Sequence, residues 1–206
     1  MWSFGIITDG IRNNQFHLPI IYSIMKQNIP NYEIIFITEN RGYSVINEEN
    51  DILKMLYIDT NKLSHITKKK NEFAKVAKYE NLCILHDYVS LGDNWFQGME
   101  TLGYKWNVTS CRYVNLDSTR YIWDYPVMGH PTLGHCHSLS YDFPLCETHY
   151  IPGIAFCVKK PFFLKNPLDN NLIHFEGEDV KWSQSFSKLE NYQFDKNNYF
   201  QFLKMR

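Results

Sequence analysis

The sequence predicts an α/β fold in which helices flank a central, mostly parallel sheet. Through the first hundred residues, apolar runs of strand length alternate with amphipathic helical patterns, as in right-handed βαβ units. The chain has 206 residues, of which 44% are hydrophobic and 16% aromatic, so it can bury a substantial core. Neither a repeat nor a linker-like stretch divides the sequence, and we therefore expect residues 1–206 to form a single domain.

The spacing of apolar residues predicts the first elements. Residues 3–7 form a short apolar strand, and apolar positions four apart predict a helix over residues 16–25, with Pro19 near its first turn. Residues 33–38 predict a second strand, and residues 53–58 predict a third. Strand, helix and strand at this spacing favour parallel pairing.

A lysine-rich helix and a fourth strand follow. The stretch 66–81 predicts a helix whose lysines face solvent and whose apolar residues, Val76 among them, face inward. Residues 82–86 predict a buried strand. Asp93 is expected to cap a helix that carries Trp95.

The second half of the chain differs from the first in composition and in the periodicity of its apolar residues. Residues 121–150 are rich in proline, glycine, histidine and aromatic residues and show little periodicity. Residues 151–160 predict a strand entered through a Pro-Gly turn, and residues 176–190 predict a helix with Leu189 on its buried face. The regular alternation of strands and helices therefore ends near residue 100.

Three of the predicted strands end in polar residues. These strand ends are Thr8-Asp9-Gly10, Thr38-Glu39 and His86-Asp87. In open parallel sheets, ligands bind outside the carboxyl ends of the strands. We therefore expect the three polar ends to line one crevice.

Composition and charge narrow the range of functions. A formal net charge of -1 lacks the basic excess of a nucleic-acid binder. The five cysteines form no Cys-x-x-Cys pair, and with their odd number we expect reduced thiols and a cytoplasmic location. No apolar stretch approaches the ~18 residues that a membrane-spanning helix needs, so we expect no integral membrane segment.

Four short motifs follow one another along the chain. They are Lys68-Lys69-Lys70-Asn71, His86-Asp87-Tyr88 with Trp95, the stretch Gly153–Val158, and Glu178-Asp179. Their order and spacing resemble the GT-A glycosyltransferases, most closely glycosyltransferase family 2. The resemblance spans nearly the whole chain and implies a GT-A fold. It implies a nucleotide-sugar-binding half over residues 1–100 and an acceptor-binding half over residues 101–206.

The resemblance also implies a reaction and a set of donor contacts. A sugar would move from a nucleotide-diphosphate sugar, a UDP-sugar above all, to a hydroxyl group of a glycan or similar acceptor. The residues implied to contact the donor are Thr8, Asp9, Gly10, Glu39, Lys70, Asn71 and His86. This chain departs from the family in its acidic cluster, which keeps one carboxylate, Asp87, between His86 and Tyr88.

The single carboxylate is the candidate metal ligand. A departing diphosphate develops negative charge, which a divalent cation can offset. Mn²⁺ or Mg²⁺ prefers oxygen ligands from carboxylates and phosphates. Asp87 supplies one such oxygen ligand and leaves positions for the diphosphate, although an aspartate in an ordinary turn is the structural alternative.

The acceptor hydroxyl must lose a proton as it attacks the anomeric carbon. The resemblance assigns this general-base role to Asp179 and gives Glu178 a role in orienting the acceptor or the helix. Acidic residues are also favoured in the first turn of a helix by capping and by the helix dipole, so a purely structural role is the alternative. An in-line displacement of this kind would invert the anomeric centre.

Two further functions stay open. A nucleotidyltransferase also combines a nucleotide-binding sheet with a metal, but the glycine-rich basic loop expected after its first strand is here TDGIRNNQF. The single carboxylate of the acidic cluster would also suit a non-catalytic sugar-binding module on the same fold. The histidines and cysteines of residues 130–149 allow a zinc site, although their irregular spacing favours an aromatic, polar acceptor-side loop.

Overall fold

The computed structural model describes residues 1–45, 50–60, 65–173 and 176–205. Within these residues, strands from both halves of the chain build one large sheet. Its strands are β1 (Trp2–Ile7), β2 (Tyr32–Thr38), β3 (Leu53–Tyr57), β4 (Asn81–His86), β5 (Val89–Leu91), β6 (Val108–Val114), β9 (Ala155–Lys159) and β10 (Tyr192–Phe202). Their order across the sheet is β3-β2-β1-β4-β9-β6-β10-β5.

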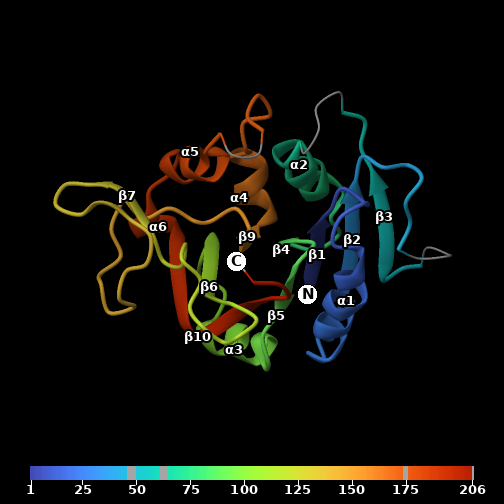
Figure 1. Cartoon of the computed structure of the whole chain (residues 1–206), viewed down its shortest axis with the longest axis horizontal. Coiled ribbons are helices and arrows are strands. Elements are labelled where there is room, and N and C mark those ends of the chain that lie inside the picture. Colours follow the sequence, from blue (N-terminus) through green and yellow to red (C-terminus); the bar gives the residue numbers. More distant parts are fainter. Residues whose placement is uncertain (46–49, 61–64, 174–175, 206) are drawn as a thin grey trace.

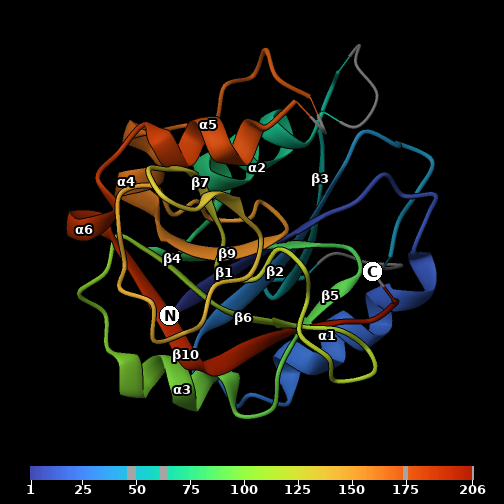
Figure 2. The same cartoon turned by 60° about the vertical axis from the view of Figure 1, so that its left-hand side comes forward.

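Helices cover both faces of this sheet (Figures 1 and 2). They are α1 (His17–Met25, after the 3-10 turn η1, Asn14–Phe16), α2 (Ile66–Val76), α3 (Trp95–Leu102), α4 (Lys160–Lys165), α5 (Glu178–Gln184) and α6 (Lys188–Asn191). α1 and α3 lie on one face, whereas α2, α4 and α5 lie together on the other. A small antiparallel pair, β7 (Val127–His130) and β8 (Gly134–Cys136), stands outside the large sheet.

The register of the parallel strands positions the site. β1 pairs in parallel with both β2 and β4, and Ile7 lies opposite Ile37 on one side and His86 on the other. The carboxyl ends of these three strands therefore meet at one edge of the sheet, as expected from their polar ends. β9 then runs antiparallel to β4, which brings the second half of the chain against the same edge.

The core has two layers because side chains alternate across the sheet. Trp2 and Phe4 of β1 face α1 and α3, where Trp95 packs edge-on against Trp2 with ring centroids 5.0 Å apart. On the other face, Phe73 of α2 is fully buried with the apolar residues of β2, β4 and β9. Gly5 of β1 leaves room for Phe73, because a Cβ there would lie 2.6 Å from the ring.

Several expectations about helix faces were wrong. Lys69 and Lys70 are 2% and 0% exposed, because their long side chains reach buried backbone carbonyls. Val76, at the end of α2, is 52% exposed, and Leu189 in α6 is 62% exposed.

The expected cap at Asp93 was also wrong. α3 begins after Asn94, whose φ of 56° is left-handed and whose side chain makes no capping hydrogen bond. Asp93 pairs instead with Lys26 at 2.7 Å. Among the described residues, no helix combines the length and the apolar composition that crossing a membrane requires.

Candidate active site

Asp87 follows β4 directly and is held by two side chains from the first loop. The Thr8 hydroxyl donates to Asp87 Oδ2 at 2.8 Å, and the Asn13 amide donates to Asp87 Oδ1 at 2.9 Å. His17 Nε2 lies 4.0 Å from Asp87 Oδ2. The carboxylate is only 5% exposed, so these neighbours fix its orientation at the sheet edge.

The loop after β1 wraps tightly around Thr8. The Gly10 N–H donates to Thr8 Oγ1 at 3.0 Å, and Gly10 has a φ of 69°, which favours glycine. Asp9 accepts from the N–H groups of Ile11 and Arg12 at 2.9 and 2.8 Å. Burial would raise the pKa of Asp9, but the Arg12 side chain and these N–H groups hold it below its usual value.

Glu39, at the end of β2, meets a lysine that was expected to face solvent. Lys69 forms an ion pair with Glu39 and donates to the Thr8 carbonyl at 2.6 Å. One buried ammonium group therefore ties the ends of β1 and β2 together. Thr8, Asp9, Gly10, Glu39 and Asp87 thus gather at one edge of the sheet. That they line one crevice stays a prediction.

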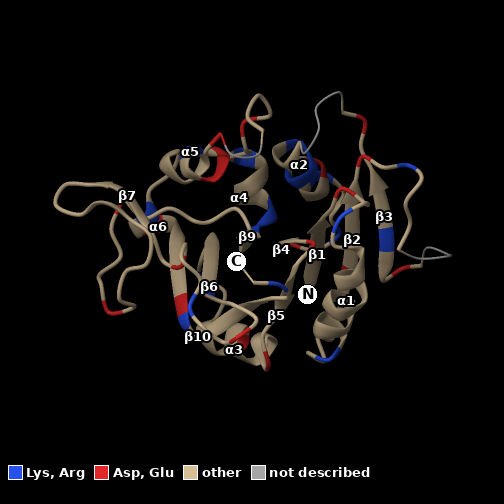
Figure 3. Ribbon diagram, viewed as in Figure 1, with Lys and Arg blue, Asp and Glu red and all other residues tan. Residues whose placement is uncertain are grey.

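Lys70 lies elsewhere, beside the acidic start of α5. Figure 3 shows basic residues along α2 and acidic residues on α5. Its ammonium group donates to the Gly153 carbonyl at 2.7 Å, and the Gly153 N–H donates to Asp179 Oδ2 at 2.8 Å. Burial lowers the pKa of Lys70, while the charges of Glu178 and Asp179 oppose that shift. Lys70 is therefore linked to Asp179 through the backbone of Gly153.

The Asn71 side chain forms hydrogen bonds with other residues of the protein. Its amide nitrogen donates to the Leu168 carbonyl and to Asn170 Oδ1, each at 2.8 Å, and its oxygen accepts from the Leu168 N–H at 3.1 Å. These bonds hold the loop after α4 against α2. A contact between Asn71 and the donor stays a prediction.

One cavity joins the end of β4 to the start of α5. Its volume is about 320 Å³, and both His86 and the pair Glu178-Asp179 line it. Aromatic side chains also line it, among them Trp123 and Tyr150. The cavity brings together one predicted donor residue and both predicted catalytic residues.

The two acids of α5 differ in exposure. Glu178 is 7% exposed, and burial raises its pKa; Lys70 partly opposes this shift, whereas Asp179 adds to it. Asp179 is half-buried, and its Oδ1 accepts from the Val180 N–H at 2.8 Å. Burial and the charge of Asp179 also raise the pKa of Tyr150. Asp179 is thus the more exposed acid of this pair.

Sequence reasoning missed the groups that hold Asp87. Asn13 has a left-handed φ of 63°, and its side chain reaches 74 positions along the chain to Asp87. His17 is 1% exposed and lies beside both Thr8 and Asp87. The Asn13-Asn14 pair marks a turn, but no local pattern indicates the partner of its side chain.

A Mn²⁺ or Mg²⁺ ion fits these donors only if a diphosphate shares it. No group of three or more His, Cys, Asp or Glu side chains is arranged to hold a metal among the residues that the structure describes. Each Asp87 oxygen accepts one of the side-chain bonds described above, which leaves acceptor capacity on the carboxylate. Mg²⁺ is commonly held by one or two carboxylates together with substrate phosphates and water.

The region that allowed a zinc site forms an aromatic cluster around the β7–β8 pair. Trp123 stacks on His137 with ring centroids 3.9 Å apart, and His135 lies beside both rings. His149 is 2% exposed, and burial lowers its pKa to about 4. This cluster places Trp123 at the rim of the cavity.

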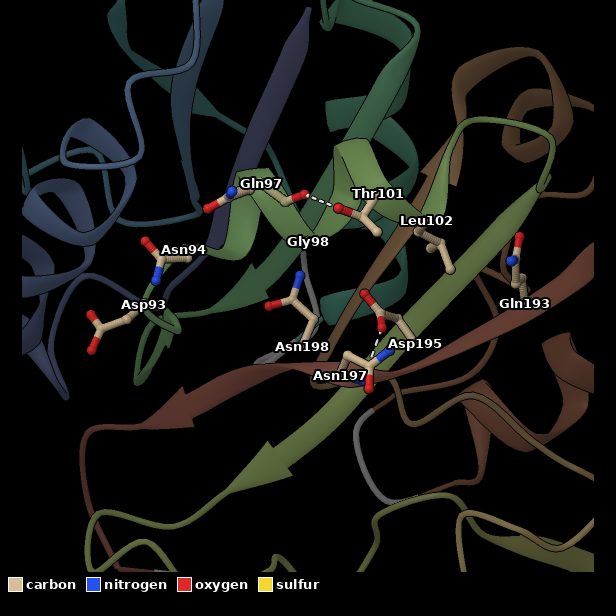
Figure 4. Close-up of a pocket in the computed structure, with 10 residues that line it drawn as sticks. All are labelled: Asp93, Asn94, Gln97, Gly98, Thr101, Leu102, Gln193, Asp195, Asn197 and Asn198. Atoms are coloured by element: carbon tan, nitrogen blue, oxygen red, sulfur yellow. Dashed lines mark hydrogen bonds between the residues drawn. The ribbon is translucent and has the colours of Figure 1, made fainter.

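A second cavity lies between α3 and β10 and shares no lining residue with the first (Figure 4). Its volume is about 570 Å³, and amide and carboxylate side chains such as Gln97, Gln193 and Asp195 line it. Figure 4 shows Asp195 accepting a hydrogen bond from the Asn197 N–H, at 3.0 Å, in the bulge that interrupts β10. None of the predicted site residues lines this cavity.

Solved structures share this fold. A crystal structure of GalNAc-T7 with UDP, GalNAc and Mn²⁺ matches 100% of this chain and 44% of that chain, with a TM-score of 0.70 and 15% identity. Structures of S. aureus TarS 1-349 match with UDP (TM-score 0.62) and with UDP-GlcNAc (0.61). Both TarS matches have 11% identity and cover 97% of this chain and 60% or 58% of that chain.

The chain therefore has a GT-A-like glycosyltransferase fold, as predicted. It spans about half the length of these solved structures. Neither a protein-family model nor a curated protein matches the sequence.

Proposed function

We propose that the chain is a metal-dependent, inverting glycosyltransferase. It would move a sugar from a UDP-sugar to a hydroxyl group of a glycan or a similar acceptor. The observation that carries this proposal is the cavity that joins His86, beside Asp87, to Glu178 and Asp179 on a GT-A-like fold. The similar structures hold UDP or UDP-GlcNAc, which favours a UDP-sugar as the donor.

In this proposal the donor nucleotide lies along the carboxyl ends of β1, β2 and β4. Asp9 and Glu39 accept hydrogen bonds from the base or the ribose, and Asp87 with the diphosphate holds the cation. The bound cation would offset the negative charge of the leaving diphosphate. Lys70 and Asn71 are bound within the protein, which favours supporting roles for both.

The transfer itself needs one proton acceptor and one open face of the sugar. Asp179 takes the proton of the acceptor hydroxyl, and the hydroxyl oxygen forms a bond to the anomeric carbon. The bond from that carbon to the diphosphate oxygen breaks, and its electron pair stays on the diphosphate. Because the two bonds lie on opposite sides of the carbon, the configuration inverts. Asp179 then releases its proton to water.

The aromatic wall of the cavity suits a sugar acceptor. The rings of Trp123 and Tyr150 present flat apolar faces, while Glu178 and Asp179 offer hydrogen-bond acceptors across the cavity. A sugar combines an apolar ring face with hydroxyl groups at its edge, which is the chemistry that such a wall recognises.

The proposal is tested by measuring UDP release from a panel of UDP-sugars, with a panel of glycan acceptors, in Mn²⁺ and in EDTA. We expect metal-dependent release from one donor and an NMR spectrum that shows inverted anomeric configuration in the product. Retained configuration would reject the inverting mechanism. Absence of release from every donor and acceptor pair would count against transferase activity.

A further inference from the structure

The bulge of β10 forms one wall of the second cavity, and α3 forms another. The bulge lies between Asp195 and Tyr199, and Asn198 joins it to α3. Asn198 Nδ2 donates to the Trp95 carbonyl at 2.8 Å, and its Oδ1 accepts from the Tyr199 N–H at 2.9 Å. A Cβ on Gly98 of α3 would lie 2.7 Å from Asn198 Nδ2, so a glycine permits this close approach. The two walls are therefore joined before any ligand binds.

Four exposed amide side chains line this cavity, and none of them is used within the fold. They form no hydrogen bond with any residue that the structure describes; they are Asn94, Gln97, Gln193 and Asn197. Each amide offers two donor hydrogens and one acceptor oxygen. The Thr101 hydroxyl donates to the backbone carbonyl of Gln97 at 3.0 Å, and its oxygen can still accept.

Asp195 adds a buried acceptor to the same cavity. The residue is 5% exposed, and its Oδ1 accepts from the Asn197 N–H. Its Oδ2 has no hydrogen-bond partner within the part of the chain that the structure describes. Figure 4 shows this side chain directed from β10 toward α3. A buried acceptor without a donor is destabilising, and a ligand group that donated to it would relieve that effect.

The lining excludes several classes of ligand. Neither lysine nor arginine is among the described residues that line the cavity, so a phosphate or a nucleotide would find no cation there. Leu102 is its one large apolar side chain, which disfavours an apolar ligand. The volume of about 570 Å³ is far larger than a single metal ion needs and falls in the range of ligand pockets.

We propose that this cavity binds a neutral oligosaccharide, at a site separate from the proposed active site. Sugar hydroxyl groups donate and accept hydrogen bonds, as the amides of the cavity do. A third cavity of about 510 Å³ adjoins it and shares Asp93, Asn94 and Gln97. The half-buried Phe96 lines the third cavity and offers a ring for a second sugar unit. Because α3 and α5 cover opposite faces of the large sheet, this site does not overlap the first cavity.

The test is calorimetric titration of the protein with chitotriose, cellotriose and maltotriose. The variants are Gln97→Ala, Gln193→Ala, the two combined, and Asp195→Asn, which removes the charge and keeps the shape. Gln15→Ala is the matched control, because Gln15 is an exposed glutamine of η1 outside the cavity. Trp123→Ala identifies any trisaccharide that binds in the first cavity instead. Thermal melting of each variant shows whether the fold is kept.

We expect one of the trisaccharides to bind the parent. Gln97→Ala and Gln193→Ala should each weaken this binding about fivefold, the effect of losing one neutral hydrogen bond. The combined variant should weaken it about twentyfold, and Asp195→Asn about tenfold, because a hydrogen bond to a charged group is stronger. Gln15→Ala and Trp123→Ala should bind the trisaccharide as the parent does.

Three results would overturn the inference. Failure of the parent to bind any of the three trisaccharides would reject an oligosaccharide site. Equal affinity in the combined variant and the parent, or loss of binding in Trp123→Ala alone, would place the sugar outside the second cavity. Binding of Ca²⁺ that Asp195→Asn removes, without binding of a trisaccharide, would reassign the cavity to a cation.

Discussion

Asp87, at the carboxyl end of β4, accepts its hydrogen bonds from two side chains, whereas Asp179, in the first turn of α5, accepts its bonds from backbone N–H groups. The partners of Asp87 come from residues 8 and 13, more than seventy positions away in the sequence. Those of Asp179 come from Val180 and from Gly153, which the buried Lys70 holds. The proposed donor end is thus built by long-range side-chain contacts, and the proposed acceptor end by a glycine turn and a helix start.

The surroundings of the two carboxylates differ in the same way. Asp87 lies in a polar network of Thr8, Asn13 and His17, which fixes the orientation of the carboxylate that we propose as a cation ligand. Asp179 lines a cavity with aromatic side chains in its wall, which suits the proposed proton transfer from a sugar hydroxyl. We therefore assign the two aspartates separate tasks in the proposed reaction, and substitutions should separate those tasks.

The largest effect is expected at Asp179. Asp179→Asn keeps the shape of the side chain but removes the base, so we expect transfer to fall by about a thousandfold. UDP affinity should stay within about twofold of the parent, because Asp179 lies at the acceptor end. Single-turnover transfer and calorimetry measure the two quantities. Glu190→Gln, at an exposed acid of α6, is the control; transfer by Asp179→Asn at the parent rate would exclude the base role.

The second effect is expected at Asp87. Asp87→Asn should remove the gain in UDP affinity that Mn²⁺ gives, about tenfold or more, because a neutral amide is a poor ligand for a hard cation. The affinity measured in EDTA should change little. Calorimetric titrations with and without Mn²⁺ measure both quantities. A metal response equal to that of the parent would reject Asp87 as the ligand.

A smaller effect is expected where Lys70, Gly153 and Asp179 meet. A Cβ on Gly153 would lie 3.0 Å from Lys70 Nζ and 3.1 Å from Asp179 Cβ, so Gly153→Ala must displace one of them. We expect transfer to fall about tenfold while UDP binding stays unchanged, since misplacing a catalytic group by a fraction of an ångström lowers the rate. Gly42→Ala, where the nearest contact is 3.4 Å, is the control.

Lys70→Met separates the two roles considered for that lysine. If Lys70 supports the acidic pair, Lys70→Met should lower the rate of transfer and leave UDP affinity unchanged. If Lys70 binds the donor, Lys70→Met should lower UDP affinity as well. Equal losses in both quantities would favour the donor role.

The smallest effect is expected in the pH dependence of stability. The pKa of Glu178 is raised by burial above its value in the unfolded chain, so the folded state holds this proton more tightly. The stability that Glu178 contributes is present at low pH and is lost as the pH rises through the raised pKa. Urea unfolding from pH 4 to pH 8 should show this loss in the parent and not in Glu178→Gln. An identical pH dependence in both proteins would contradict the assignment.

Parts of this site followed from local sequence, and others did not. The polar ends of β1, β2 and β4 and the acidic start of α5 are local patterns, and the structure places them as expected. The burial of Lys69 and Lys70 was missed because periodicity treats lysine as polar, while its long side chain can reach buried carbonyls. β10 was missed because a bulge between Asp195 and Tyr199 interrupts its alternation.

Calorimetric titration of the protein with UDP, GDP and their sugar conjugates, each in Mn²⁺ and in EDTA, would show directly whether a nucleotide donor binds at the end of β4. We expect binding of UDP and a UDP-sugar that Mn²⁺ strengthens and EDTA weakens. Absence of binding by every nucleotide, in both conditions, would contradict a donor site at the end of β4. It would leave the GT-A-like fold as the scaffold of a non-catalytic module.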